Sequence, residues 1–99
     1  MTEQPLKRAH LYISGRVQGV NYRYYSKLQA DSLGIVGWVR NLFDRRVEAI
    51  FEGDEITVEK MIDWCRKGPN AARVDNVDIH WEEPTGEFSH FEIKRTFGW

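Results

Sequence analysis

Two glycines, Gly15 and Gly19, separate a segment with strand alternation from a segment with helical spacing. Apolar and polar side chains alternate over residues 8–14, which is typical of a strand with one buried face. Over residues 22–33, a stripe recurs every three or four positions, which is typical of an amphipathic helix. The chain is therefore predicted to pass from a strand through a tight turn directly into a helix, which requires a fold of mixed α and β type.

Such a turn can bind an anion, above all a phosphate. Its backbone N–H groups can converge on one point, and the N-terminus of the following helix adds partial positive charge. Arg23 falls in the first turn of the predicted helix, from which its guanidinium can donate two hydrogen bonds to the same anion. The pattern also fits a strand–helix connector with no ligand, in which Arg23 forms a surface ion pair. The turn alone therefore does not distinguish an anion-binding site from a connector.

The rest of the chain continues to alternate between strand and helix patterns. Strands are expected over residues 35–41, 47–51, 77–81 and 90–96, and a second helix is expected between Asp54 and Gly68. Two helices that share one face of the sheet would bury all the apolar stripes together. This order predicts an α+β, ferredoxin-like split βαβ sandwich, βαββαβ plus a C-terminal strand, on a mainly antiparallel sheet.

Several local features refine this prediction. Asn21 and Asp54 are expected as N-caps of the two helices, and Gly34 is expected to end the first. In the strand over residues 47–51, apolar side chains are expected to alternate with outward-facing charged ones. In the last strand, Phe91 and Ile93 are expected to face inward.

Composition predicts one domain over residues 1–99, with residues 1–6 as a loose tail and residues 97–99 as an extension. A net charge of -1 provides no basic excess for binding nucleic acid or an anionic membrane. Cys65 falls on an apolar helix face and is expected to be a buried, inert thiol, and His10 is expected to be an ordinary half-exposed residue. With no apolar run of membrane-spanning length and no signal peptide, we expect a cytoplasmic monomer.

Residues 15–23, Gly-Arg-Val-Gln-Gly-Val-Asn-Tyr-Arg, resemble the first signature of the acylphosphatase family, Gly-x-Val-Gln-Gly-Val-x-Phe-Arg. Every fixed position matches except the aromatic, where Tyr22 replaces the usual Phe. A second stretch is similar to the other family signature, with matches at Gly37, Trp38, Val39, Arg40, Asn41, Val47 and Gly53. The resemblance extends from about residue 10 to residue 93 and also implies the ferredoxin-like fold.

The resemblance implies hydrolysis of acyl phosphates to a carboxylate and inorganic phosphate, without a metal ion or cofactor. The substrate-binding residues would be Arg16, Val17, Gln18, Gly19 and Val20 of the Gly15–Val20 loop. Arg23 would hold the phosphoryl oxygens with this loop, and Asn41 would orient the attacking water. An amide is no strong base, but an acyl phosphate needs little base catalysis, because its carboxylate leaving group departs unprotonated.

Two features depart from the family pattern. Arg45 occupies the hairpin position where the family has a glycine. Either the position keeps a positive φ, which would cost about 1 kcal/mol, or Asp44 changes the type of turn. Phe97-Gly98-Trp99 extend past the usual family end. A second hypothesis is therefore a non-catalytic ferredoxin-like module that binds an anion or a partner through the same loop. A third, binding of single-stranded RNA, is disfavoured because the chain lacks an aromatic and basic RNA-binding signature.

Overall fold

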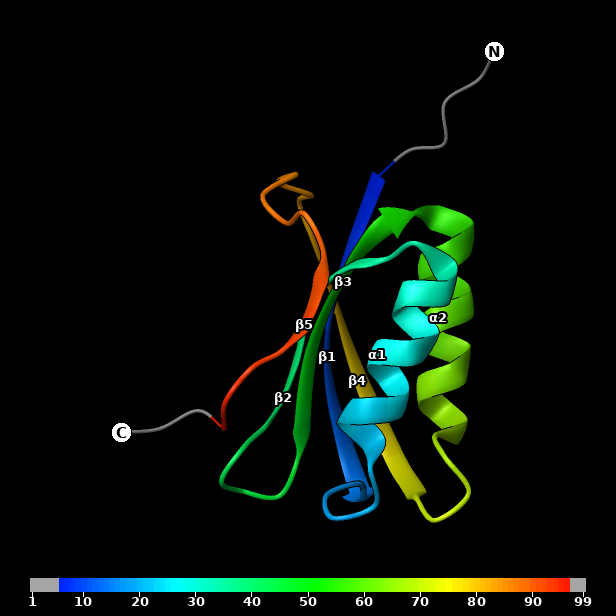
Figure 1. Ribbon diagram of the computed structural model, residues 1–99, viewed down its shortest axis with the longest axis vertical. Helices are drawn as coiled ribbons and strands as arrows, with labels where there is room; N and C mark the ends of the chain where they lie inside the picture. Colours follow the sequence, from blue (N-terminus) through cyan, green and yellow to red (C-terminus); the bar gives the residue numbers. More distant parts are fainter. Residues whose placement is uncertain (1–5, 97–99) are drawn as a thin grey trace.

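The computed structural model describes residues 6–96, and residues 1–5 and 97–99 lie outside the described residues. Its elements follow the predicted order: β1 (Leu6–Arg16), α1 (Tyr22–Leu33), β2 (Val36–Asn41), β3 (Val47–Asp54), α2 (Glu55–Lys67), β4 (Arg73–Glu82) and β5 (Phe91–Ile93) (Figure 1). Leu6 begins β1, so its assignment to a loose tail was wrong; the rest of that tail and the predicted extension over 97–99 fall outside the described residues. No helix among the described residues is long and apolar enough to cross a membrane.

The five strands form one sheet in the order β4-β1-β3-β2-β5. Neighbouring strands are antiparallel except β2 and β5, which run parallel. Both helices lie on one face of this sheet, α1 over β2 and β5 and α2 over β1, β3 and β4 (Figure 1). The structure thus confirms the predicted ferredoxin-like α+β arrangement.

The core lies between the sheet and the two helices. β1 contributes Ala9, Leu11 and Ile13, all with fully buried side chains. The predicted stripe of α2 is buried against them and consists of Val58, Met61, Ile62 and Cys65. Phe91 is buried as predicted, but Ile93 is 39% exposed, so the expectation that both face inward was wrong for Ile93. Ile93 lies near the open edge of the sheet, where it lines a pocket described below.

β3 differs from its predicted alternation because it is buried on both faces. Glu48 was expected to point outward into solvent but is only 5% exposed, and Glu52, just past the predicted strand, is only 1% exposed. The connection from β4 to β5 covers this part of the helix-free face, where Glu52 accepts hydrogen bonds from the backbone N–H groups of Thr85 and Gly86 at 3.1 and 2.8 Å. These bonds compensate for the burial of the Glu52 carboxylate.

The helix ends follow local sequence signals closely. Asp54 caps α2 by accepting a hydrogen bond from the Thr57 backbone N–H at 2.9 Å, as predicted. Gly34 ends α1 in the left-handed conformation, with φ of 71°. Asn21 occupies the N-cap position of α1, but its φ is 63° and its side chain makes no capping hydrogen bond. The N-terminus of α1 therefore has no side-chain cap from Asn21.

Candidate active site

The loop between β1 and α1 has a backbone suited to binding an anion. Gly19 has φ of 75° and Asn21 has φ of 63°, whereas Gln18 and Val20 have negative φ. Alternation of right- and left-handed residues turns successive N–H groups toward a common concave side, and such concavities bind anions. The N-terminus of α1 at Tyr22 follows directly and adds the positive end of its dipole.

At Gly15, where β1 leads into the loop, the backbone packs closely against β4. The register between the two strands shifts between Ser14 and Gly15, and a Cβ at Gly15 would lie 2.1 Å from the carbonyl oxygen of Arg73. Its φ of 127° is also a conformation that other residues rarely adopt. Gly15 therefore lets the end of β1 approach its neighbour β4 closely at the register shift and continue into the loop.

Gln18 joins this loop to the turn between β2 and β3. Its Nε2 donates hydrogen bonds to the carbonyl oxygens of Leu42 and Arg46, at 2.8 and 2.9 Å. Asn41, the last residue of β2, directly precedes this turn. Both segments lie at the same end of the sheet (Figure 1). The amide of Gln18 therefore holds Asn41 in a fixed position relative to the anion-binding loop.

Arg23 and Asn41 line the same pocket, whose volume is about 190 Å³. The loop contributes Val17, Gln18 and Gly19 to the wall, and the remaining lining residues are Asn21, Tyr22, Tyr24 and Ile93. Asn41 Oδ1 is buried and accepts no hydrogen bond from any residue within 6–96. A buried acceptor without a partner is costly in a structural role and points to a ligand or water as its partner.

The other two predicted site residues lie elsewhere. Arg16 lines a neighbouring groove instead of the pocket, and Val20 is only 7% exposed and belongs to the core cluster. Val20 therefore packs in the core and supports the loop from the side opposite to solvent. The site residues predicted from the sequence did not include four others that line the pocket: Asn21, Tyr22, Tyr24 and Ile93. A signal for Tyr24 existed in its position beside Arg23 on the first helical turn, whereas Ile93 comes from the far end of the chain.

Tyr22 anchors the N-terminal end of α1 on α2. Its ring is 1% exposed, and its hydroxyl donates a hydrogen bond to the carbonyl oxygen of Cys65 at 2.8 Å. Burial raises the pKa of the Tyr22 hydroxyl far above its usual value, and burial also raises the pKa of the Cys65 thiol to about 12. Cys65 is thus the buried, un-ionised thiol that the sequence predicted.

Arg45 occupies the second left-handed position that carries a side chain, with φ of 77°. Its backbone N–H donates to the Leu42 carbonyl at 3.2 Å, and Leu42 N–H donates to the Arg46 carbonyl at 2.8 Å. The position therefore keeps the conformation that a glycine adopts freely. The arginine tolerates it at a cost of about 1 kcal/mol.

His10 lies apart from this pocket, on the helix-free face of the sheet. Its Nε2 is 2.6 Å from Glu48 Oε2 and its Nδ1 is 2.8 Å from Glu82 Oε2. The side chain is 19% exposed, so it is more enclosed than the half-exposed residue expected. Within the described range, no three His, Cys, Asp or Glu side chains are grouped so as to hold a metal ion.

Comparison with known proteins identifies the family. A model of the acylphosphatase family matches residues 9–93. The chain belongs to the acylphosphatase family. The acylphosphatase of Roseiflexus sp. (strain RS-1) is 56% identical over 88 residues, which cover 89% of this chain and 95% of that protein. The family prediction made from the two signatures is confirmed.

Solved acylphosphatases share the fold. The crystal structure of the Bacillus subtilis acylphosphatase is similar with a TM-score of 0.86 and 29% identity, covering 91% of this chain and 99% of that one. The Coxiella burnetii acylphosphatase has the same TM-score at 30% identity, covering 95% of this chain and 100% of that one. Membership in the family favours a hydrolase over the non-catalytic binding module.

Proposed function

We propose that this acylphosphatase-family chain hydrolyses the carboxyl–phosphate bond of acyl phosphates, releasing a carboxylate and inorganic phosphate without a metal ion or cofactor. The observation that carries this proposal is the shared pocket. It combines an anion-binding loop, the cation Arg23 and the buried, unpartnered Oδ1 of Asn41. These groups provide charge stabilisation and one acceptor for water, which are the two requirements of this reaction.

The phosphoryl group binds between the loop and Arg23. Val17, Gln18 and Gly19 of the loop and Arg23 of α1 all line this pocket, so the loop N–H groups and the Arg23 guanidinium can bind one phosphoryl group. Negative charge spread over the phosphoryl oxygens is stabilised most strongly in the transition state by such fixed donors. Val20 and Arg16 act indirectly in this proposal, Val20 through loop packing and Arg16 from the neighbouring groove.

Asn41 orients the attacking water. Its Oδ1 accepts a hydrogen bond from a water whose oxygen attacks phosphorus in line with the acyl oxygen. The bond from phosphorus to the acyl oxygen breaks, its electron pair stays on the carboxylate, and the proton of the water passes to the phosphate product. A carboxamide is sufficient because the carboxylate leaves without protonation.

The test is steady-state hydrolysis of benzoyl phosphate at neutral pH, with and without a chelator. Asn41→Ala should lower kcat by about a hundredfold or more while competitive inhibition by phosphate is kept. Arg23→Ala should weaken phosphate inhibition as well as kcat. Asn76→Ala and Arg66→Ala are the matched controls, because both residues are exposed and line neither loop pocket. A folded parent that binds phosphate but hydrolyses nothing would favour the non-catalytic module.

We also propose that residues 1–99 act as one cytoplasmic, monomeric domain that binds no nucleic acid. The even charge balance, with Lys+Arg 14 and Asp+Glu 15, supports the last point. Size-exclusion chromatography with light scattering tests the oligomeric state. A mass of twice 11.7 kDa would contradict the monomer.

A further inference from the structure

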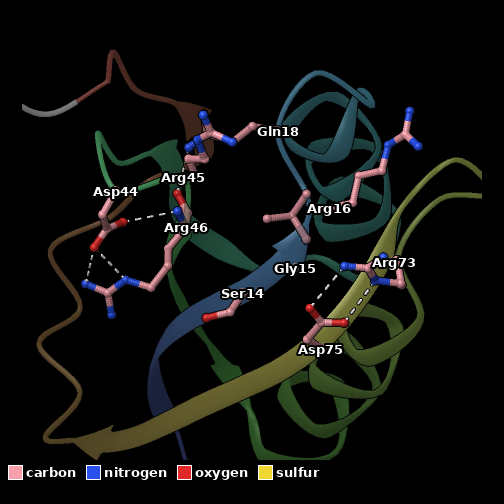
Figure 2. A pocket seen from close by; sticks show the side chains of 10 residues that line it. Ser14, Gly15, Arg16, Gln18, Asp44, Arg45, Arg46, Arg73 and Asp75 are labelled. Carbon is pink, nitrogen blue, oxygen red and sulfur yellow. Dashed lines mark hydrogen bonds and ion pairs between the residues drawn. The ribbon is translucent and has the colours of Figure 1, made fainter.

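A second groove adjoins the phosphate pocket. Its volume is about 540 Å³, and it lies among the end of β1, the loop, the β2–β3 turn and the start of β4 (Figure 2). The residues that line it are Ser14, Gly15, Arg16, Val17, Gln18, Asp44, Arg45, Arg46, Arg73 and Asp75. Val17 and Gln18 line both cavities and form their common wall. A molecule with its phosphate in the first pocket can therefore extend into this groove.

The groove is positively charged, with four arginines and two aspartates. Arg46 pairs with Asp44 at 2.8 Å, and Arg73 pairs with Asp75 at 3.1 Å (Figure 2). The side chains of Arg16 and Arg45 form no ion pair, hydrogen bond or ring contact with any other residue between 6 and 96. Two guanidinium charges are thus left without a protein partner next to the phosphate pocket. An apolar acyl chain would gain little from such a surface, whereas an anionic one would be attracted.

Arg45 is held where it can act on a substrate. It lies in the β2–β3 turn. The Gln18 side chain of the loop donates hydrogen bonds to two carbonyl oxygens of this turn, those of Leu42 and Arg46. Arg45 also keeps a left-handed φ of 77°, at the hairpin position where the second family signature has a glycine. Backbone strain that persists beside a binding cavity points to a functional gain from the side chain.

We propose that this groove, through Arg45 and Arg16, selects acyl phosphates whose acyl part carries a second negative charge. The inference rests on the proposed hydrolysis in the adjoining pocket. The phosphate binds in the pocket at the loop and Arg23. The second anionic group extends past Val17 and Gln18, which line both cavities, into the groove that Arg45 lines. Arg16 lines the same groove and adds its charge. Arg45 is then a specificity-determining residue, while Arg23 and Asn41 carry the reaction.

The test compares two substrates of the same shape, 4-carboxybenzoyl phosphate and 4-carbamoylbenzoyl phosphate, together with their 3-substituted isomers. For the full chain at low salt, kcat/KM should be about fivefold higher for at least one carboxylate than for its amide. The ratio should fall to about one in Arg45→Gln, persist in Arg45→Lys, and decrease as salt screens the charges. The control Arg66→Gln removes an exposed arginine from α2 and should leave the ratio unchanged.

The outcomes separate this inference from the proposed function. Efficient hydrolysis with equal kcat/KM for each carboxylate and amide pair would overturn the inference and leave the proposed function intact. If the folded parent hydrolyses none of the four substrates, calorimetry measures whether the groove prefers a second anionic group. The two ligands compared are 4-carboxybenzyl phosphonate and 4-carbamoylbenzyl phosphonate. A carboxylate preference that Arg45→Gln abolishes would support the groove without the hydrolysis, and equal affinities would overturn it. Arg16→Gln, which leaves the strained turn untouched, is the second variant should Arg45→Gln fail to fold.

Discussion

The side-chain amide of Gln18 donates a hydrogen bond to the carbonyl oxygen of Leu42 at 2.8 Å. This bond spans 24 residues of sequence and links the anion-binding loop to the residue that follows Asn41. A second bond from the same nitrogen reaches the Arg46 carbonyl. The two halves of the proposed site, the phosphate loop and the water-orienting amide, are therefore held together by one side chain.

Gln18→Ala should misplace Asn41 relative to the loop. We expect kcat to fall about ten- to hundredfold with a smaller change in KM, because the loop N–H groups and Arg23 remain. The unfolding free energy should fall by about 1–2 kcal/mol through the loss of two partly buried hydrogen bonds. Steady-state kinetics and urea unfolding measure both effects, with Gln29→Ala on α1 as the control. An unchanged kcat in Gln18→Ala would show that the link does not position Asn41.

Arg45→Gly should stabilise the chain. The φ of 77° costs an arginine about 1 kcal/mol, and glycine removes this strain while losing some stability through its freer unfolded state. We expect a net gain of about 0.5 kcal/mol, or a melting temperature a few degrees higher. Arg45→Ala keeps a Cβ and should bring no such gain. Equal melting temperatures for the glycine and alanine variants would contradict the strain at this turn.

Tyr22→Phe should be destabilising, although phenylalanine is the usual residue in the family signature. The substitution leaves the buried carbonyl oxygen of Cys65 without the hydroxyl that donates to it at 2.8 Å. The expected loss is about 1 kcal/mol in the unfolding free energy. Tyr25→Phe, at a residue with 44% exposure, is the matched control and should have little effect. A Tyr22→Phe variant as stable as the parent would mean that the hydroxyl provides no net stability here.

Stability should decrease in acid because of the carboxylates beside His10. Burial acts to raise the pKa of Glu48, but hydrogen bonds from His10 and Arg40 outweigh it and lower that pKa below 4.5. The hydrogen bond from His10 likewise lowers the pKa of Glu82. A depressed folded-state pKa gives stability that is present above the unfolded-state pKa and is lost as pH falls through the folded-state value.

Urea unfolding between about pH 3 and pH 7 measures this dependence. The transition midpoint of the parent should fall steeply below pH 4.5. Glu48→Gln should be less stable at neutral pH and show a shallower fall in acid, whereas Glu83→Gln, in the exposed connection after β4, should follow the parent. Parallel curves for Glu48→Gln and the parent would contradict the role of Glu48.

Features set by neighbouring residues could be predicted from the sequence. The bounds of α1 follow from its spacing and from Gly34, and the Asp54 cap follows from its position before an apolar stripe. At Arg45 the sequence left two possibilities open, a positive φ as for the family glycine or a different turn type through Asp44, and the structure has the positive φ. The two family signatures also indicated Arg23 and Asn41 as site residues, and both line the same pocket.

Features that depend on distant segments could not be predicted. Glu52 is buried because the connection from β4 to β5, more than 30 residues further along the chain, donates to it. The alternation predicted over residues 47–51 gave no sign that β3 is buried on both faces. Ile93 reaches the phosphate pocket only because β5 pairs in parallel with β2. Chain periodicity carries no information on such pairings, because it describes only local geometry.

The most direct test of the account is hydrolysis of benzoyl phosphate by the parent in water enriched in oxygen-18, with the products analysed by mass spectrometry. In the proposed mechanism, Asn41 orients the attacking water toward phosphorus bound at the loop and Arg23. The heavy oxygen should therefore enter inorganic phosphate, and benzoate should remain unlabelled. Label in the benzoate would show attack at the acyl carbon and would contradict the proposed mechanism.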